Sequence, residues 1–209
     1  ANKIWNASRF VLMNLEGKDV TEPEIGSLCA EDKWILSRLN NVIKEVTDNM
    51  EKYELGIAVQ KIYDFLWDEL CDWYIEIAKV RLWKAAEEIY CTLLPEEESI
   101  MISDWPVYKD EWNSPEAELA IGSFQEVVRG IRNTRTSMNV PQNRKTHLII
   151  VGKDAAICQM YENSKKSFAN LAFAKEIHVQ QDKTGIGEDA VSVVVSNAVV
   201  YMPLEDLVD

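Results

Sequence analysis

This sequence of 209 residues lacks most of the patterns that mark an enzyme or a membrane protein. Its two histidines, His147 and His178, each lie inside a predicted strand, where a histidine usually has a structural role. No glycine-rich phosphate loop occurs, and no nucleophile is paired with a base. No run of about 18 apolar residues occurs, and Ala1 opens an amphipathic pattern rather than a signal peptide, so we expect no membrane partner. These absences argue against an enzyme that acts alone.

Cysteine is scarce and scattered. The four cysteines, Cys29, Cys71, Cys91 and Cys158, show no Cys-x-x-Cys spacing, and we therefore expect no metal site. Dispersed thiols of this kind are typical of a cytoplasmic protein with free cysteines.

Positive charge is also scarce. The sequence carries 22 Lys and Arg against 35 Asp and Glu, a net charge of −13, which is the wrong sign for a general nucleic-acid binder, and we expect no DNA partner. The charge is uneven, however, because no acidic residue occurs between Val127 and Lys153. That window contains six basic residues: Arg129, Arg132, Arg135, Arg144, Lys145 and Lys153. Acidic bulk with one basic stretch fits a protein that binds RNA at selected points.

The hydrophobic pattern divides the chain into two parts. Apolar residues recur with a period near 3.6 over residues 2–15, 31–50 and 54–83, which predicts three long helices in an antiparallel bundle. A fourth helix is predicted over 116–137, and the pattern then changes. Short strands are expected at 147–152, 177–179 and within 191–203, with helices at 153–162 and 163–174. We therefore predict a mainly α chain, with a helical bundle over 1–102 and a small α+β domain over 103–209.

Four stretches, in chain order, resemble one known family. Residues 67–79 read Trp-x-Glu-x-Cys-Asp-Trp-Tyr-x-Glu-x-Ala-Lys, and residues 2–11 read Asn-Lys-Ile-Trp-Asn-Ala-Ser-Arg-Phe-Val. Residues 131–141 run from Ile-Arg-Asn to Met-Asn-Val-Pro, and residues 201–209 begin Tyr-Met-Pro-Leu. All four resemble the C-terminal part of valyl-tRNA synthetases, which begins with the anticodon-binding domain.

The resemblance implies an RNA-binding function without catalysis. It implies recognition of the tRNA(Val) anticodon by part of a valine–tRNA ligase, in a chain that is a monomer and binds no cofactor. ATP and magnesium belong to the catalytic domain of such an enzyme, which these residues do not include. The equivalent domain of an isoleucyl-tRNA synthetase is one alternative, although those enzymes usually lack the Cys-Asp-Trp-Tyr element. An acidic helical module that binds proteins, and not RNA, is the other.

The resemblance also assigns residues to the anticodon. Phe10 and Ile75 match positions that sandwich a base, and Lys3 matches a position that meets a neighbouring base or phosphate. Asn6 and Arg9 lie one helical turn from these anchors and are further candidates. If the assignment holds, Phe10 is partly exposed and Ile75 lies across a gap wide enough for a flat base. Three arginines, Arg129, Arg132 and Arg135, recur every three residues and are either a contact for RNA phosphate or ordinary solvent-facing charge.

The sequence departs from the family in two further places. The family continues after the helix of residues 67–79 into another bundle helix, whereas here Trp83-Lys84-Ala85-Ala86 runs almost directly into Glu87-Glu88. We therefore predict a discontinuity at residues 83–88. The terminal coiled-coil arm of the family would begin where this sequence ends, at Asp209.

Overall fold

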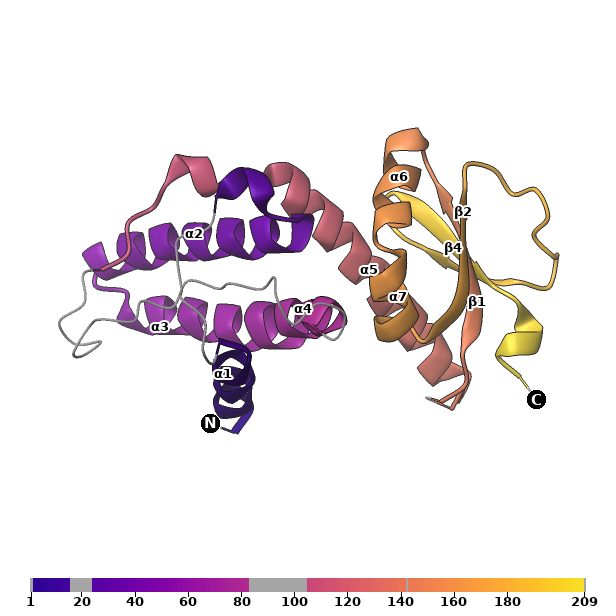
Figure 1. Ribbon diagram of the computed structural model, residues 1–209, viewed down its shortest axis with the longest axis horizontal. Coiled ribbons are helices and arrows are strands. Elements are labelled where there is room, and N and C mark those ends of the chain that lie inside the picture. Colours follow the sequence, from indigo (N-terminus) through magenta and orange to yellow (C-terminus); the bar gives the residue numbers. More distant parts are fainter. Residues whose placement is uncertain (1, 16–23, 83–104, 142, 209) are drawn as a thin grey trace. The chain divides into compact units, whose positions relative to one another are not determined.

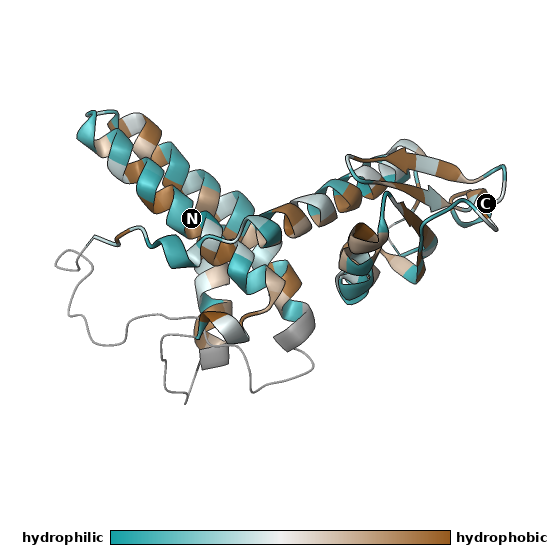
Figure 2. Cartoon of the chain, turned by 90° about the horizontal axis from the view of Figure 1, so that it is seen from above, coloured by the Kyte–Doolittle hydropathy of each residue, from teal (hydrophilic) through white to brown (hydrophobic). Residues whose placement is uncertain are grey.

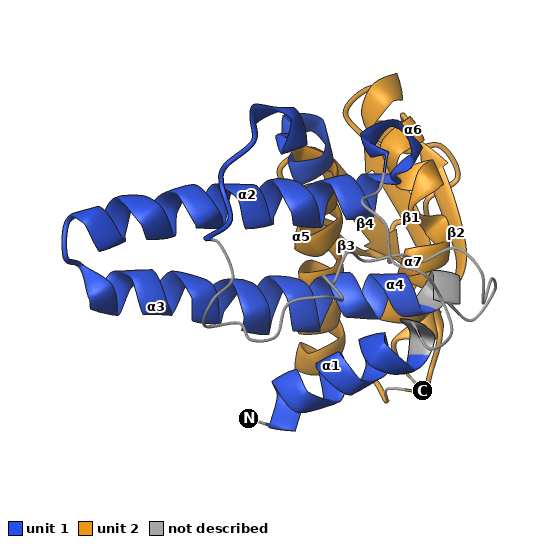
Figure 3. Cartoon of the chain, turned by 60° about the vertical axis from the view of Figure 1, so that its left-hand side comes forward, with its two compact units in different colours: residues 1–118 blue, residues 119–209 orange. Residues whose placement is uncertain are grey.

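A computed structural model describes residues 2–15, 24–82, 105–141 and 143–208. The chain forms two compact units, residues 1–118 and residues 119–209 (Figure 3). The sequence placed this division earlier, at residue 102. The difference arises because residues 105–114, which carry no regular hydrophobic period, bind by hydrogen bonds to the first unit.

The first unit is helical, as predicted. Its long helical elements are α1 (Asn2–Leu15), α2 (Ala30–Glu51), α3 (Leu55–Asp64), η2 (Phe65–Tyr74) and α4 (Ile75–Leu82), and two short helices are η1 (Ile25–Ser27) and η3 (Asp110–Trp112). Helix α2 runs antiparallel to the continuous α3–η2–α4 rod, and α1 packs against η2 (Figure 1). Residues 31–80, all of them described, contain no strand, which agrees with the predicted bundle.

A left-handed residue ends α2 and reverses the chain. Tyr53 has φ 59°, and its N–H donates to the carbonyl of Met50 over 3.0 Å. The N–H of Glu54 donates to the carbonyl of Asn49 over 2.8 Å. These two bonds satisfy the last carbonyls of α2 in a Schellman motif, which allows α3 to start at once and return along α2.

Helix α2 has an apolar face and two polar side chains that form hydrogen bonds with residues 105–114. Its buried apolar residues include Trp34, Ile35, Val42, Ile43 and Val46. Asn40 is fully buried, donating to the carbonyl of Lys109 and accepting from the N–H of Lys109, both over 2.8 Å. Ser37, also fully buried, accepts from the N–H of Ser114 over 3.0 Å. Buried amide and hydroxyl groups need such partners, so these bonds fix residues 105–114 on the first unit.

The middle of the predicted third helix is a π-helix. In η2 the hydrogen bonds join residues five apart, as in the bond from the N–H of Ile75 to the carbonyl of Leu70. This wider turn places Trp73, Tyr74 and Ile75 all in the interior, although they are consecutive. The Tyr74 hydroxyl donates to Asp32 of α2 over 2.9 Å. The rod is therefore covered on more than one side, with α2 and α1 each packed against η2.

The second unit is a four-stranded sheet with helices. Strand β1 (Thr146–Gly152) pairs in parallel with β2 (Ala174–Gln180) and antiparallel with β4 (Ala198–Met202), and β4 pairs antiparallel with β3 (Val191–Val194). Helices α6 (Ala155–Asn163) and α7 (Lys165–Leu171) connect β1 to β2. Helix α5 (Pro115–Ser137) contributes its residues from 119 onward. The predicted α+β unit is thus confirmed.

One face of this sheet forms the core of the second unit. Alternate residues of β1 are buried, and the strands are largely apolar (Figure 2). Fully buried side chains of α5, Val127, Val128 and Ile131, share this core with Leu148 and Val200. The rings of Phe124 and Phe168 lie 4.6 Å apart, centroid to centroid. Tilted ring pairs at this distance add stability beyond the area that they bury.

A histidine–carboxylate pair ties the end of the chain to β1. Asp206, in the short helix η4 (Leu204–Asp206), accepts from the His147 N–H over 2.8 Å and lies 2.7 Å from its Nδ1. Burial alone would raise the pKa of Asp206, but the bonds from His147 and the charges of His147 and Lys175 outweigh it and lower that pKa. His147 therefore has the structural role expected of a strand histidine.

This pair predicts a pH-dependent stability. A lowered carboxyl pKa stabilises the fold above the unfolded value, near pH 4, and the contribution is lost as pH falls through the folded pKa. We expect Asp206→Asn to lower the melting temperature by about 3 °C at pH 7, since such a pair contributes up to about 1 kcal/mol. The gap to the parent chain should narrow as pH falls below about 4 and through the lowered folded pKa of Asp206. A gap that stays the same from neutral to acid pH, measured by circular dichroism, would contradict this account.

Candidate nucleic-acid interface

The residues that the sequence assigned to RNA lie in two separate groups. Lys3, Asn6, Arg9, Phe10 and Ile75 belong to the first unit. The arginines of α5 belong to the second unit.

Lys3 joins α1 to the π-helix. Its ammonium donates to the carbonyl of Trp67 over 3.0 Å and lies 2.6 Å from Asp72 Oδ1. It also lies 4.4 Å from the centroid of the Trp67 ring, within the range of a cation–π interaction. Its side chain is 27% exposed. Lys3 therefore positions α1 in this structure, and its predicted contact with a base or phosphate, which remains a prediction, would require it to leave these partners.

Phe10 is partly exposed, as the anticodon assignment requires. The ammonium of Lys79 lies over its ring, 5.6 Å from the centroid. Lys79 is in turn paired with Glu76, whose Oε1 lies 2.5 Å from Nζ. One flat side chain of α1 thus lies beside a cation and a carboxylate of α4.

Ile75 does not have the predicted exposure. It is 5% exposed, so the expectation of an open gap between Phe10 and Ile75 is not met in this structure. The physical reason is the π-helix, which places Ile75 in the same buried run as Trp73 and Tyr74. Ile75 therefore belongs to the interior of the first unit and presents no face to solvent.

Helix α1 exposes more apolar surface than its period indicates. Trp5, Leu12 and Met13 are 70%, 60% and 64% exposed, although the sequence placed Trp5 and Leu12 on its apolar stripe. Asn6 and Arg9 are exposed as well. The spacing of seven residues between Trp5 and Leu12 puts both on one face of the helix, and that face is exposed. An exposed indole on this helix is a second flat surface on which a base could stack.

The three arginines of α5 have different environments. Arg129 and Arg132 are exposed, and the Arg132 guanidinium donates to the carbonyl of Leu171 over 2.9 Å. Arg135 is 4% exposed, and its guanidinium donates to the carbonyls of Pro141 and Arg144 over 3.0 and 2.6 Å. Burial, and to a lesser degree the charge of Arg144, lowers the pKa of Arg135. The predicted phosphate contact is thus not supported at Arg135, because its donors bind the backbone inside the unit.

The chemistry open to these groups is binding. Among the residues that the structure describes, no group of three or more His, Cys, Asp or Glu side chains could hold a metal ion. No helix in the described ranges is both long enough and apolar enough to cross a membrane. A partly exposed ring, an exposed indole and nearby cations are what base stacking and phosphate contact require.

Comparison with known proteins gives a family. A sequence model of the anticodon-binding domain of tRNA ligase matches residues 32–94 and 85–150. The valine–tRNA ligases of Clostridium tetani and Clostridium acetobutylicum are 41% and 39% identical to the whole of this chain. That of Clostridium perfringens is 41% identical, again over the whole chain. The chain spans 27% of the length of each of these relatives.

The relatives contain residues that this chain lacks. The match to the Clostridium tetani protein is 241 positions long, 32 more than the 209 residues of the chain. The two matches to the family model overlap over residues 85–94, which include part of the predicted discontinuity at 83–88. That discontinuity lies outside the described residues. The family model nevertheless matches more than half of the sequence, and the chain therefore belongs to the family of anticodon-binding domains of tRNA ligases.

Proposed function

We propose that this chain recognises the anticodon of tRNA(Val) as part of a valine–tRNA ligase. The observation that carries the proposal is the match of the whole chain, at 39–41% identity, to proteins of that name. In such an enzyme, valine is attached to tRNA(Val) with ATP and Mg²⁺ in a catalytic domain outside these residues. The present residues would contribute RNA recognition, as a monomeric part of a cytoplasmic enzyme.

The first unit has the features that anticodon reading needs. Bases of a single-stranded loop are bound by stacking on flat side chains and by hydrogen bonds to their edges. Phe10 offers a partly exposed ring, and Asn6 and Arg9 offer exposed polar groups on the same helix. Because α1 is fixed to η2 through Lys3, these groups have a defined geometry before RNA binds. Preorganisation lowers the entropic cost of binding.

The test is binding of the chain to tRNA(Val), to tRNA(Val) with a substituted anticodon, and to tRNA(Ile). A substituted base can still stack, but it no longer matches the hydrogen bonds made to the edges of the original base. A polar group left unpaired in this way costs about 1–3 kcal/mol, so we expect anticodon substitution to weaken binding by about 5- to 150-fold. Affinity for tRNA(Val) should also fall steeply with salt. Equal affinity for all three RNAs would contradict anticodon recognition. Preference for tRNA(Ile) would assign the chain to the sister enzyme.

A protein-binding module is the second candidate, because α3 exposes an apolar stripe. Leu55, Val59, Ile62 and Tyr63 are 56%, 66%, 37% and 48% exposed at helical spacing. An exposed apolar stripe of this kind is typical of a surface that another protein segment covers. The salt dependence separates the candidates, since apolar docking changes little with salt while phosphate binding weakens.

A further inference from the structure

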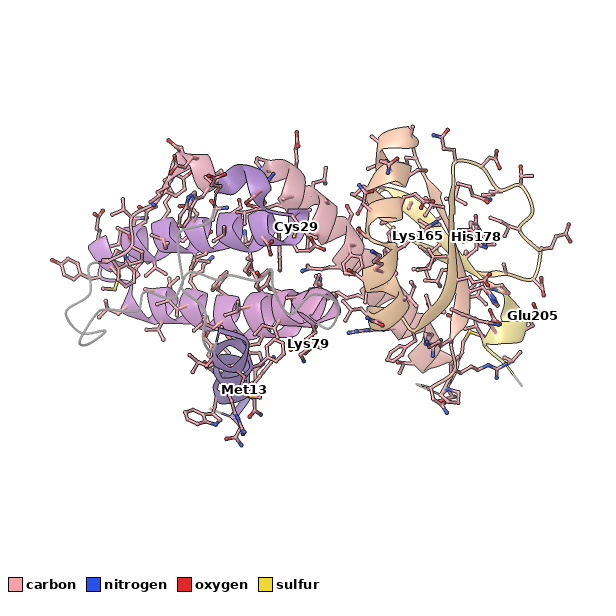
Figure 4. The ribbon with its side chains drawn as sticks, in the orientation of Figure 1. Met13, Cys29, Lys79, Lys165, His178 and Glu205 are labelled. Carbon is pink, nitrogen blue, oxygen red and sulfur yellow. The ribbon has the colours of Figure 1, made fainter. Side chains whose placement is uncertain are left out.

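A lysine of α4 lies over the aromatic ring that would receive a base. Lys79 Nζ is 5.6 Å from the centroid of the Phe10 ring, inside the range of about 6 Å over which an ammonium is attracted to an aromatic face. The same ammonium is 2.5 Å from Oε1 of Glu76, one turn earlier on α4. Figure 4 shows Lys79 at the end of α4. One side chain therefore contacts both the ring of α1 and the carboxylate of α4.

Lys79 is a side chain of α4 that a ligand can displace. Ile75, four residues earlier, is 5% exposed and packed in the interior. The side chains of Lys79 and Glu76 are 38% and 41% exposed. An ion pair this exposed contributes at most about 1 kcal/mol, so a ligand can break it at small cost.

We propose that the Glu76–Lys79 pair is a displaceable cover of Phe10. A base that stacks on the Phe10 ring takes the place of the Lys79 ammonium, which then binds a phosphate of the same RNA. Glu76 opposes this exchange, because it holds Lys79 in place and repels phosphate. The inference rests on the proposed function and adds Lys79 as an RNA contact and Glu76 as a residue that restrains it.

The cover has a consequence for selectivity. A duplex offers phosphates that attract Lys79, but its bases are stacked on one another and cannot fill the space over the ring. A single-stranded loop offers both a phosphate and an unstacked base. A base can therefore replace the Lys79 ammonium on Phe10 only when the ligand is loop RNA. Glu76 weakens the binding of ligands that supply charge alone, because it repels their phosphates. Because the first unit is also acidic overall, the repulsion by Glu76 favours recognition of an RNA loop over general binding of polyanions.

The chain offers a matched control in its second unit. Lys165 and Glu162 form a pair with the same spacing of three residues, an N–O distance of 2.6 Å, and side chains 35% and 40% exposed. Lys165 lies on the second unit, as Figure 4 also shows. Substitutions in this pair change the net charge by the same amount as those at Glu76 and Lys79. They separate a local effect from a general electrostatic one.

The experiment measures binding of the whole chain to an RNA hairpin with the anticodon loop of tRNA(Val), over a range of salt. We expect Glu76→Gln to bind about two- to fivefold tighter, since one exposed ion pair no longer opposes the exchange. Lys79→Met should bind more weakly, with the slope of log K against log salt reduced by about 0.7 to 0.9. Lys79→Arg should restore the slope. Glu162→Gln and Lys165→Met should have much smaller effects.

Two outcomes would overturn the inference alone, and a third would overturn the proposed function as well. If Glu76→Gln binds no tighter than Glu162→Gln, or if Lys79→Met keeps the parent salt slope, the pair is an ordinary surface ion pair while anticodon recognition stands. If the parent chain binds the hairpin no better than a blunt RNA duplex, the proposed function fails, and the inference fails with it. Melting temperatures of all variants verify that each is folded when its binding is measured.

Discussion

Arg135→Ala is expected to destabilise the second unit by about 3 kcal/mol without weakening RNA binding by the folded protein. The Arg135 side chain is 4% exposed, and its guanidinium donates to the carbonyls of Pro141 and Arg144. It also lies 5.5 Å from the centroid of the Phe173 ring. Alanine would leave these acceptors without a donor and create a cavity, and an unsatisfied buried group costs about 1–3 kcal/mol. Arg135 therefore holds the turn between α5 and β1.

The two units can be followed separately in this experiment. All seven tryptophans lie before residue 119, so tryptophan fluorescence in urea reports the first unit, while hydrogen exchange of β1 reports the second. Arg129→Ala is the control, because Arg129 is an exposed arginine of the same helix. We expect it to change the stability by less than about 0.5 kcal/mol. Unchanged protection of β1 in Arg135→Ala together with lost affinity for tRNA would instead make Arg135 an RNA contact.

Most of the fold could be predicted from hydrophobic spacing. The helices predicted at 31–50 and 116–137 are observed at Ala30–Glu51 and Pro115–Ser137. Each of these helices buries one face, and the apolar residues of a buried face recur with a helical period in the sequence. The strand predicted at 177–179 begins earlier, at Ala174. Lys175 and Glu176 are exposed there, on an edge strand that needs no apolar residue at those positions.

Two features of the first unit have no signature in spacing. The π-helix Phe65–Tyr74 keeps a helical hydrophobic pattern, and its five-residue bonds accompany packing against both α1 and α2. The division between the units depends on the buried groups of Ser37 and Asn40, which bind a stretch about 70 residues later in the sequence. Hydrogen bonds between polar groups so far apart in the sequence depend on the folded structure, and they produce no periodic pattern in the local sequence.

The candidate RNA-binding residues could also be predicted only in part from the sequence. Partial exposure of Phe10 followed from its assignment to the anticodon, whereas the partners of Lys3 depend on how α1 packs against η2, and the burial of Ile75 follows from the π-helix before it. Arg129, Arg132 and Arg135 recur every three residues, and each step of three drifts by about 60° around a helix. Over two steps the side chain turns from solvent to interior, as Arg129 and Arg135 show. A regular spacing of charges therefore does not define one charged face.

Phe10→Ala is expected to weaken binding of tRNA(Val) by about 1–3 kcal/mol, or about 5- to 150-fold. The ring is partly exposed on α1, and a base that stacks on it gains contact across a whole aromatic face. The effect on stability should be smaller than that of removing a fully buried ring, because the Phe10 ring is only partly buried, and its contact with the Lys79 ammonium at 5.6 Å contributes about 1 kcal/mol or less.

Two further substitutions at Phe10 separate stacking from apolar packing. Phe10→Leu keeps an apolar side chain of similar reach but removes the flat face, so we expect parent-like stability with most of the loss in tRNA affinity. Phe10→Tyr keeps the face and should bind within about twofold of the parent, since stacking does not depend on the hydroxyl. Leu12→Ala, at a position of α1 that is 60% exposed, controls for loss of apolar surface on the same helix. The contrary outcome is a sharp fall in the melting temperature of Phe10→Ala while the protein that remains folded binds tRNA(Val) normally. Phe10 would then belong to the packing between α1 and α4. The next candidate for base stacking would be Trp5, whose indole is 70% exposed on the same helix.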